Sequence, residues 1–131
     1  AKVLAAAPRL KVISKWGTGI DSIDAQAAAE RGIRVCRTPN AFSEPVADTV
    51  LGYMLNFARQ PNRMNQEIRA GKWEKPILTA LNECVLGVVG VGDCGKAVVR
   101  RAIAFGMRVL GNDLKEMPAD FIDETEFSDL F

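Results

Sequence analysis

Three glycines and one aspartate are the residues of this sequence best suited to chemistry. Gly90, Gly92 and Gly95 follow an apolar run and open a helical pattern, and an acid, Asp113, stands 18 residues after the last of them. Glycines at this spacing permit a tight turn, a close approach of the backbone to a pyrophosphate and close helix–strand packing. The N–H groups at the start of the helix favour phosphates, and an acid after the second strand can accept hydrogen bonds from ribose hydroxyls. The pattern therefore predicts a dinucleotide site.

The stretch from residue 84 to 113 supports this interpretation, because its pattern is that of strand, glycine turn, helix, strand and acidic terminus. A 2′-phosphate beside Asp113 would face a like charge, so NAD is favoured over NADP, although Lys115 could soften this preference. The alternative is a flavodoxin-like unit with a merely tight turn. The predicted cofactor-binding residues in this stretch are Gly90, Val91, Gly92, Asp93, Cys94, Gly95 and Asp113.

Asp93 is the residue of the turn whose charge does not suit a phosphate site. A carboxylate between the second and third glycines would repel a pyrophosphate unless it turned away. We expect its side chain to cap the helix, because aspartate is favoured at that position. The same helix carries Arg100 and Arg101, which we expect to face solvent or phosphate, and neither is expected to be a catalytic arginine.

The composition excludes several kinds of function. The chain has 131 residues with 17 basic and 16 acidic side chains, so neither nucleic acid nor a membrane is an expected partner. It has no histidine, which excludes histidine acid–base chemistry within the chain and most zinc sites, and no metal site is predicted. Its three cysteines show no C-x-x-C spacing and are typical of a reducing compartment, which favours the cytoplasm.

Two units of strand, turn, helix and strand must position these residues. In the first, residues 10–14 and 33–36 have the pattern of strands, and residues 25–31 that of a helix capped by Asp24 and ended by Gly32. The second unit contains the glycine motif. Repeated units of this kind predict an α/β fold with a parallel sheet.

A long helix is expected between these two units, with Ser43 as its cap and Pro61 at its end. Apolar residues recur along it at helical spacing, which predicts a broad buried face and makes Val46 a core residue on periodicity alone. A shorter helix is expected at residues 63–70, followed by an irregular stretch in which we expect Trp73 to be packed.

Several motifs upstream of the glycines occur in the order of a known family. They are Gly17-Thr18-Gly19-Ile20-Asp21-Ser22-Ile23-Asp24, then Thr38-Pro39-Asn40, then Val46-Ala47-Asp48-Thr49. This order resembles that of the NAD-dependent D-isomer-specific 2-hydroxyacid dehydrogenases, the family of phosphoglycerate, glycerate and formate dehydrogenases. The resemblance covers residues 10–113. Asp48 is a mild departure, because the family usually carries glutamate there.

The resemblance implies a fold and a division into domains. A three-layer, doubly wound parallel sheet, the Rossmann NAD-binding domain, would be present in part, together with part of a flavodoxin-like substrate domain. Residues 1–41 would be the C-terminal part of the substrate domain, and residues 42–131 the N-terminal part of the NAD-binding domain. The seam between them is expected around residues 38–42.

The resemblance also implies roles for residues outside the glycine motif. The N–H groups of Gly17, Thr18 and Gly19 would face the substrate carboxylate, which suits an anion physically; an ordinary strand-to-helix turn is the alternative. Val46 would be a further cofactor-binding residue near the nicotinamide, on a helix that acts as the hinge between domains. Residues 61–77 would form a homodimer interface.

The implied function is that of an oxidoreductase that transfers a hydride between NAD and a 2-hydroxy or 2-oxo acid. The family's catalytic arginine, glutamate and histidine belong to the later half of the NAD-binding domain, so no catalytic residue is expected in this chain. We therefore expect an internal fragment of an enzyme, inactive alone. One alternative is an NAD(H)-sensing, corepressor-like binding protein on the same fold. Another is an isolated half-domain, which would expose strand edges and should aggregate or dimerise.

Overall fold

The computed structural model describes residues 2–115 and 123–124 of the chain, which divides into two compact units. Unit 1 comprises Ala1–Phe42 and unit 2 comprises Ser43–Phe131. Both contain parallel strands and helices, so the fold is the predicted α/β fold, with a partial domain of parallel strands in each unit. The boundary lies one residue after the expected one, and the assignment of the units to a substrate and a cofactor domain stays a prediction.

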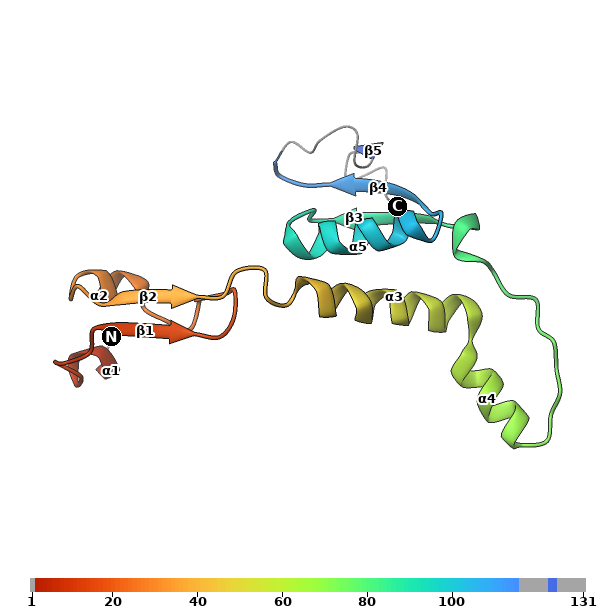
Figure 1. Ribbon diagram of the computed structural model, residues 1–131, viewed down its shortest axis with the longest axis horizontal. Helices are drawn as coiled ribbons and strands as arrows, with labels where there is room; N and C mark the ends of the chain where they lie inside the picture. Colours follow the sequence, from red (N-terminus) through yellow and green to blue (C-terminus); the bar gives the residue numbers. More distant parts are fainter. Residues whose placement is uncertain (1, 116–122, 125–131) are drawn as a thin grey trace. The chain divides into compact units, whose positions relative to one another are not determined.

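Unit 1 is a two-stranded parallel sheet with two short helices (Figure 1). Its elements are α1 (Lys2–Ala5), β1 (Val12–Lys15), α2 (Ala25–Ala29) and β2 (Arg34–Arg37). The strands pair in parallel with Val12 opposite Arg34, and the core contains Leu4, Ala27, Ala28 and Ile33. Both strands begin one or two residues later than predicted, because Leu10 and Ile33 pack in or against this core without pairing in the sheet.

The predicted signals at both ends of α2 are confirmed. The Oδ1 atom of Asp24 accepts a hydrogen bond of 2.9 Å from the N–H of Ala27, as an N-cap does. Gly32, just beyond the helix, has a φ of +65°, a left-handed conformation that glycine adopts at low cost. The helix itself is shorter than predicted and ends at Ala29.

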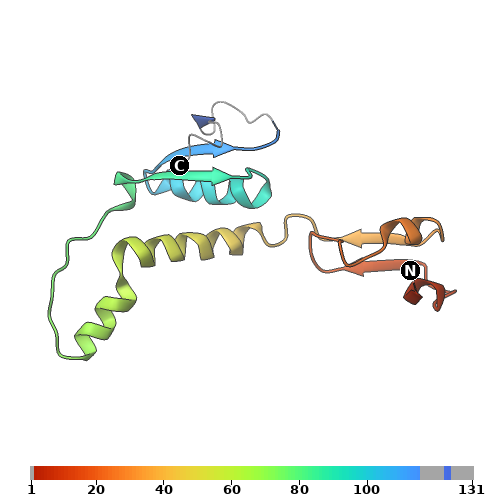
Figure 2. The same cartoon turned by 180° about the vertical axis from the view of Figure 1, so that it is seen from behind.

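Unit 2 is a three-stranded parallel sheet with α5 packed along it and α3 packed on α5 (Figures 1 and 2). Its elements are α3 (Ser43–Arg59), α4 (Pro61–Arg69), the 3₁₀ helix η1 (Leu81–Glu83), β3 (Val85–Val89), α5 (Asp93–Ala104), β4 (Arg108–Asn112) and β5 (Asp123–Glu124). The strand order is β3-β4-β5, and Val85 lies opposite Arg108. Ala47 and Leu51 of α3 meet Val99 and Ala102 of α5 in the core.

The buried face of α3 is narrower than the sequence predicted. Ala47 and Leu51 are buried, whereas Val46 is 42% exposed and Phe57 is also exposed. The prediction that Val46 belongs to the core is therefore wrong. The reason is geometric, because α3 packs mainly against α5 along the face that carries Ala47 and Leu51, and Val46 lies on another face of the helix.

The connection after α3 differs from the prediction in two ways. The shorter helix begins at Pro61 rather than residue 63, because proline is favoured at the first position of a helix, and Gln60 bridges the two helices with a φ of +47°. Trp73 was expected to be packed, but it is 77% exposed. It lies in a stretch without helix or strand and lines a pocket of about 220 Å³ beside α4 instead of reaching the core. None of the helices in the described part of the chain is long and apolar enough to cross a membrane.

Candidate functional site

The three glycines of the motif, two between β3 and α5 and one in the first turn of α5, have different surroundings. Gly90 has a φ of +86°, and its N–H donates to the carbonyl of Asn112 at 2.8 Å, so the turn requires a left-handed residue here. A Cβ atom at Gly95 would overlap the carbonyl oxygen of Gly90, so this glycine lets α5 pack closely on the end of β3. A Cβ atom at Gly92 would meet no atom within 4 Å. Neither the backbone conformation at position 92 nor packing against the described residues requires glycine there.

The start of α5 presents backbone donors without a side-chain cap. The helix begins at Asp93 with Gly92 as its N-cap residue, and no side chain of the described residues forms a cap hydrogen bond. The first N–H groups of a helix have no partner within the helix, and its dipole is positive at this end, so an anion is favoured there.

The expectation that Asp93 caps the helix is wrong. The N-cap must be the last non-helical residue before the first turn, and Gly92 occupies that position. Asp93 is one residue too late and lies exposed in the first turn of α5.

Asp113 follows β4 and closes back on the glycine turn. Its Oδ2 atom accepts a hydrogen bond of 2.6 Å from the N–H of Val91, and its Oδ1 atom accepts one of 3.1 Å from the N–H of Lys115. The backbone N–H of Lys115, followed by that of Val91, holds the pKa of this carboxyl below its ordinary value of 3.8. Asp113 is therefore an anion at neutral pH and is oriented at the edge of the turn.

The turn at Gly17 in unit 1 is tied to the end of β2. The N–H of Gly17 donates to Oγ1 of Thr38 at 2.9 Å, and its carbonyl accepts from the N–H of Thr38 at 3.1 Å. The guanidinium of Arg37 donates to the carbonyl of Thr18 at 3.1 Å. The N–H groups of Thr18 and Gly19 make no hydrogen bond among the described residues, so these two are the donors left for a ligand.

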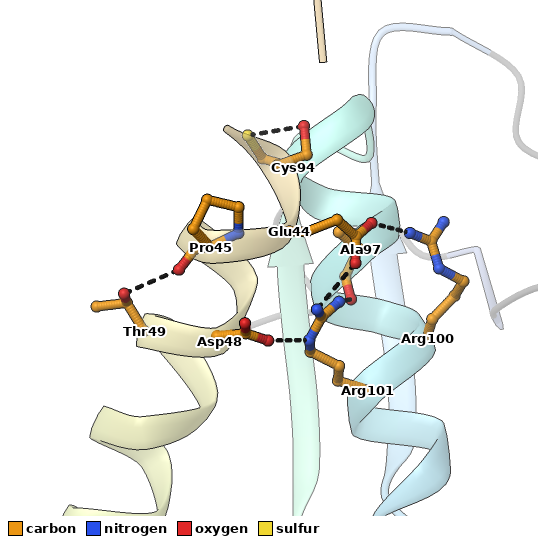
Figure 3. Close-up of polar contacts among 9 residues, drawn as sticks. Glu44, Pro45, Asp48, Thr49, Cys94, Ala97, Arg100 and Arg101 are labelled. Atoms are coloured by element: carbon orange, nitrogen blue, oxygen red, sulfur yellow. Dashed lines mark hydrogen bonds and ion pairs between the residues drawn. The ribbon is translucent and has the colours of Figure 1, made fainter. Parts of the chain in front are cut away.

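Four charged side chains join the first turns of α3 to the middle of α5 (Figure 3). Glu44 accepts from Nη2 of Arg100 at 2.6 Å and from Nη2 of Arg101 at 2.8 Å, and Asp48 accepts from Nε of Arg101 at 2.7 Å. The hydrogen bond from Arg101 is the main cause that lowers the pKa of Glu44, and the bonds to Glu44 and then Asp48 raise the pKa of Arg101. Next to them, Sγ of Cys94 lies 3.6 Å from Oγ of Ser43.

The expectation of a solvent-facing side chain is confirmed for Arg100, which is exposed, but not for Arg101, which is only 24% exposed. Both arginines are paired with carboxylates of α3, which the sequence did not predict. Glu44 and Asp48 are four residues apart on one helix and could have been recognised as one charged face. Their partners could not, because the sequence does not say which face of α5 meets α3.

Comparison with known proteins identifies the family. The sequence model of the family described as D-isomer specific 2-hydroxyacid dehydrogenase, catalytic domain, matches residues 1–127. The chain belongs to this family. The resemblance in its motifs is thereby confirmed.

Relatives of this 2-hydroxyacid dehydrogenase chain are considerably longer than it is. Hydroxypyruvate reductase from Thermotoga maritima is 38% identical over 129 residues, which are 94% of this chain and 42% of that protein. D-3-phosphoglycerate dehydrogenase from Sus scrofa is 40% identical over 113 residues, which are 85% of this chain and 21% of that protein. A crystal structure of D-lactate dehydrogenase from Aquifex aeolicus, complexed with NAD and lactic acid, matches with a TM-score of 0.85 and 28% identity over 98% of this chain and 40% of that chain.

The 2-hydroxyacid dehydrogenase chain thus spans between about a fifth and two fifths of these relatives. Their names are those of reductases and dehydrogenases, so its family is one of enzymes, and the corepressor-like alternative receives no support from them. Among the residues described by the structure, no group of three or more histidines, cysteines, aspartates and glutamates is placed to hold a metal.

Proposed function

We propose that this chain binds NAD at the turn between β3 and α5, and that the protein to which it belongs transfers a hydride between NAD and a 2-hydroxy or 2-oxo acid. The observation that carries the proposal is the turn itself. Gly90 is explained by its backbone conformation and Gly95 by packing, but Gly92 faces open space. A glycine that the protein does not need is accounted for by a pyrophosphate that approaches the backbone closely.

The residues of the turn fit a dinucleotide. The uncapped N–H groups at Asp93, Cys94 and Gly95 would donate to the phosphates, and the oriented carboxylate of Asp113 would accept from the adenosine ribose hydroxyls. Because Asp113 is anionic, a 2′-phosphate is disfavoured and NAD is preferred to NADP. When bound, the nicotinamide ring supplies the hydride chemistry of the reaction. Val46, exposed in the first turn of α3, would contact the nicotinamide half.

The turn at residues 17–19 would hold the carboxylate of the acid substrate. The N–H groups of Thr18 and Gly19 are the donors for this role, while Gly17 supports the turn through Thr38. A relative is named hydroxypyruvate reductase, and the D-lactate dehydrogenase structure contains lactic acid, so a small 2-hydroxy or 2-oxo acid is the substrate class we propose.

We further propose a homodimer formed through residues 61–77 and a cytoplasmic location. The pocket beside α4 is lined by apolar side chains of this segment, including Met64, Ile68, Trp73 and Pro76, which a second copy could cover. All three cysteines are free thiols, as in a reducing compartment.

Replacing Gly92 by alanine tests the cofactor site. A Cβ atom there has room in the protein, so Gly92→Ala should fold normally and lose at least about tenfold in NADH affinity, because the methyl group meets the pyrophosphate. Binding is measured from NADH fluorescence, with the melting temperature as a check on folding. Gly52→Ala is the matched control, because a Cβ atom there also meets nothing within 4 Å, but the residue lies in the middle of α3. Unchanged NADH affinity in Gly92→Ala, or no NADH binding by the wild-type chain, would contradict the proposal.

A further inference from the structure

The chain on each side of the boundary between the two units is anchored within its own unit. The ring of Phe42, the last residue of unit 1, lies 5.6 Å from the ring of Trp16 in the same unit. Ser43, the first residue of unit 2, is only 3% exposed, and its hydroxyl contacts the thiol of Cys94 in α5. The peptide between Phe42 and Ser43 therefore joins two held segments, and α3 is fixed to unit 2 from its first residue.

Arg101 is the centre of the contacts that fix α3, and its guanidinium uses three donors at once. Nη2 donates to Glu44 and Nε to Asp48, while Nη1 donates to the carbonyl of Ala97 on its own helix at 3.0 Å (Figure 3). The side chain is only 24% exposed. A planar guanidinium held at three donors has one orientation, so the two carboxylates that it binds are held in fixed places. We call Glu44, Asp48, Arg100 and Arg101 the α3 clamp.

The α3 clamp sets which side of α3 faces α5. Glu44 and Asp48 are four residues apart and share one face of the helix, whereas Val46 is two residues from each and lies on a different face. Val46 is exposed there, and the clamp leaves it uncovered. Because α5 begins at the glycine turn, fixing α3 on α5 also fixes Val46 with respect to that turn.

We propose that Arg101 is a positioning residue that places the first turn of α3, and with it Val46, for the nicotinamide half of bound NAD. This inference rests on the proposed function. The adenosine half would be held by the glycine turn and Asp113, which form no hydrogen bond or ion pair with the clamp within the described part of the chain. The two halves of the cofactor should therefore depend differently on Arg101.

The test compares NADH with ADP-ribose, which lacks the nicotinamide, by titration calorimetry on the 131-residue chain. Arg101→Met should lower the affinity for NADH about three- to tenfold, which is the effect expected from losing a few exposed ion pairs. It should change the affinity for ADP-ribose less than about twofold. Arg31→Met is the matched control. Arg31 donates to the carbonyl four residues earlier at 3.0 Å, as Arg101 does, but lies in unit 1 and should change neither affinity.

Substitutions at Asp48, on α3, test the same ion pair from its other partner. They also replace the first test if Arg101→Met does not fold. Asp48→Asn removes the charge that Arg101 binds and should weaken NADH selectively, whereas Asp48→Glu keeps the charge and should retain most of the affinity. If Arg101→Met and Asp48→Asn weaken the binding of NADH and ADP-ribose equally, or weaken neither, Arg101 is not a positioning residue. The proposed function would still hold in that case, provided that the wild-type chain binds NADH. Failure of the wild-type chain to bind either ligand would overturn both.

Discussion

Gly90, Gly92 and Gly95 show how residues of one type in one turn can be required for separate physical reasons. The first is needed for a left-handed backbone, the third for the approach of α5 to Gly90, and the second for neither. Substitutions at these positions should therefore have different consequences. Substitution of Gly90 or Gly95 should change the stability of the fold, whereas substitution of Gly92 should change ligand binding.

Replacing Gly95 by alanine should destabilise the fold before any ligand is considered. The added methyl group overlaps the carbonyl oxygen of Gly90 and also comes to 3.6 Å from Val88, so α5 must move away from β3. The expected loss is about 1–3 kcal/mol in the free energy of unfolding, as for other overpacked sites. Urea unfolding followed by circular dichroism measures it, and Gly52→Ala provides the reference. If Gly95→Ala is as stable as the wild type, the close packing described here is not what the turn requires.

At the scale of elements, the important contact is that of α3 with α5. Ala47 and Leu51 pack against α5 in the core, and the α3 clamp flanks this apolar contact with charges. Exposed ion pairs contribute little to stability singly, so burial holds the two helices together and the clamp selects their relative rotation. The same arrangement leaves Val46 exposed.

The α3 clamp should make stability depend on acidity through Glu44. The hydrogen bond from Arg101 is the main cause that lowers the pKa of Glu44 below its ordinary value of 4.5 in the folded protein. The stabilising contribution of this ion pair is therefore complete above pH 4.5. As the pH falls below 4.5 and passes through the lowered pKa, the carboxylate is protonated and this contribution is lost. Wild type should therefore melt at a higher temperature than Glu44→Gln at neutral pH, and the difference should shrink in acid. A difference that is independent of pH would argue against the ion pair.

At the scale of the whole molecule, several of the exposed apolar side chains of unit 2 lie on α4 or in the segments directly before and after it. They include Phe57, Ile68, Trp73 and Ile77. Exposed clusters of large apolar residues are typical of interfaces, and aromatic residues contribute most to binding at such sites. This pattern supports the proposed homodimer through residues 61–77.

Trp73→Ser should weaken the proposed dimer at least about tenfold, because the indole is the largest exposed side chain of that segment. Sedimentation velocity over a range of protein concentrations measures the change. Trp16→Ser is the control, since Trp16 is 81% exposed but belongs to unit 1, and its loss should leave the association unchanged. A wild-type chain that is monomeric at every concentration would contradict the dimer.

Local signals in the sequence were sufficient to predict the strand–turn–helix–strand unit, the cap and stop of α2, and the family. Each of these depends on residues close together in the chain, such as Asp24 with Ala27 or the glycines of one turn. Asp93 was misplaced by one position, because a helix can begin one residue to either side of an expected cap. Whether the predicted ligands bind at the turns around Gly17 and Gly92 stays a prediction.

The sequence by itself therefore determined the secondary structure around the glycine turn and membership of the 2-hydroxyacid dehydrogenases, since both reside in the order and spacing of residues. Only the tertiary structure decided that Arg100 and Arg101 bind α3, that Val46 and Trp73 are exposed, and that Gly92 faces open space. These properties depend on which surfaces of distant segments meet. Helical periodicity shows that a face exists, but packing between elements determines what covers it.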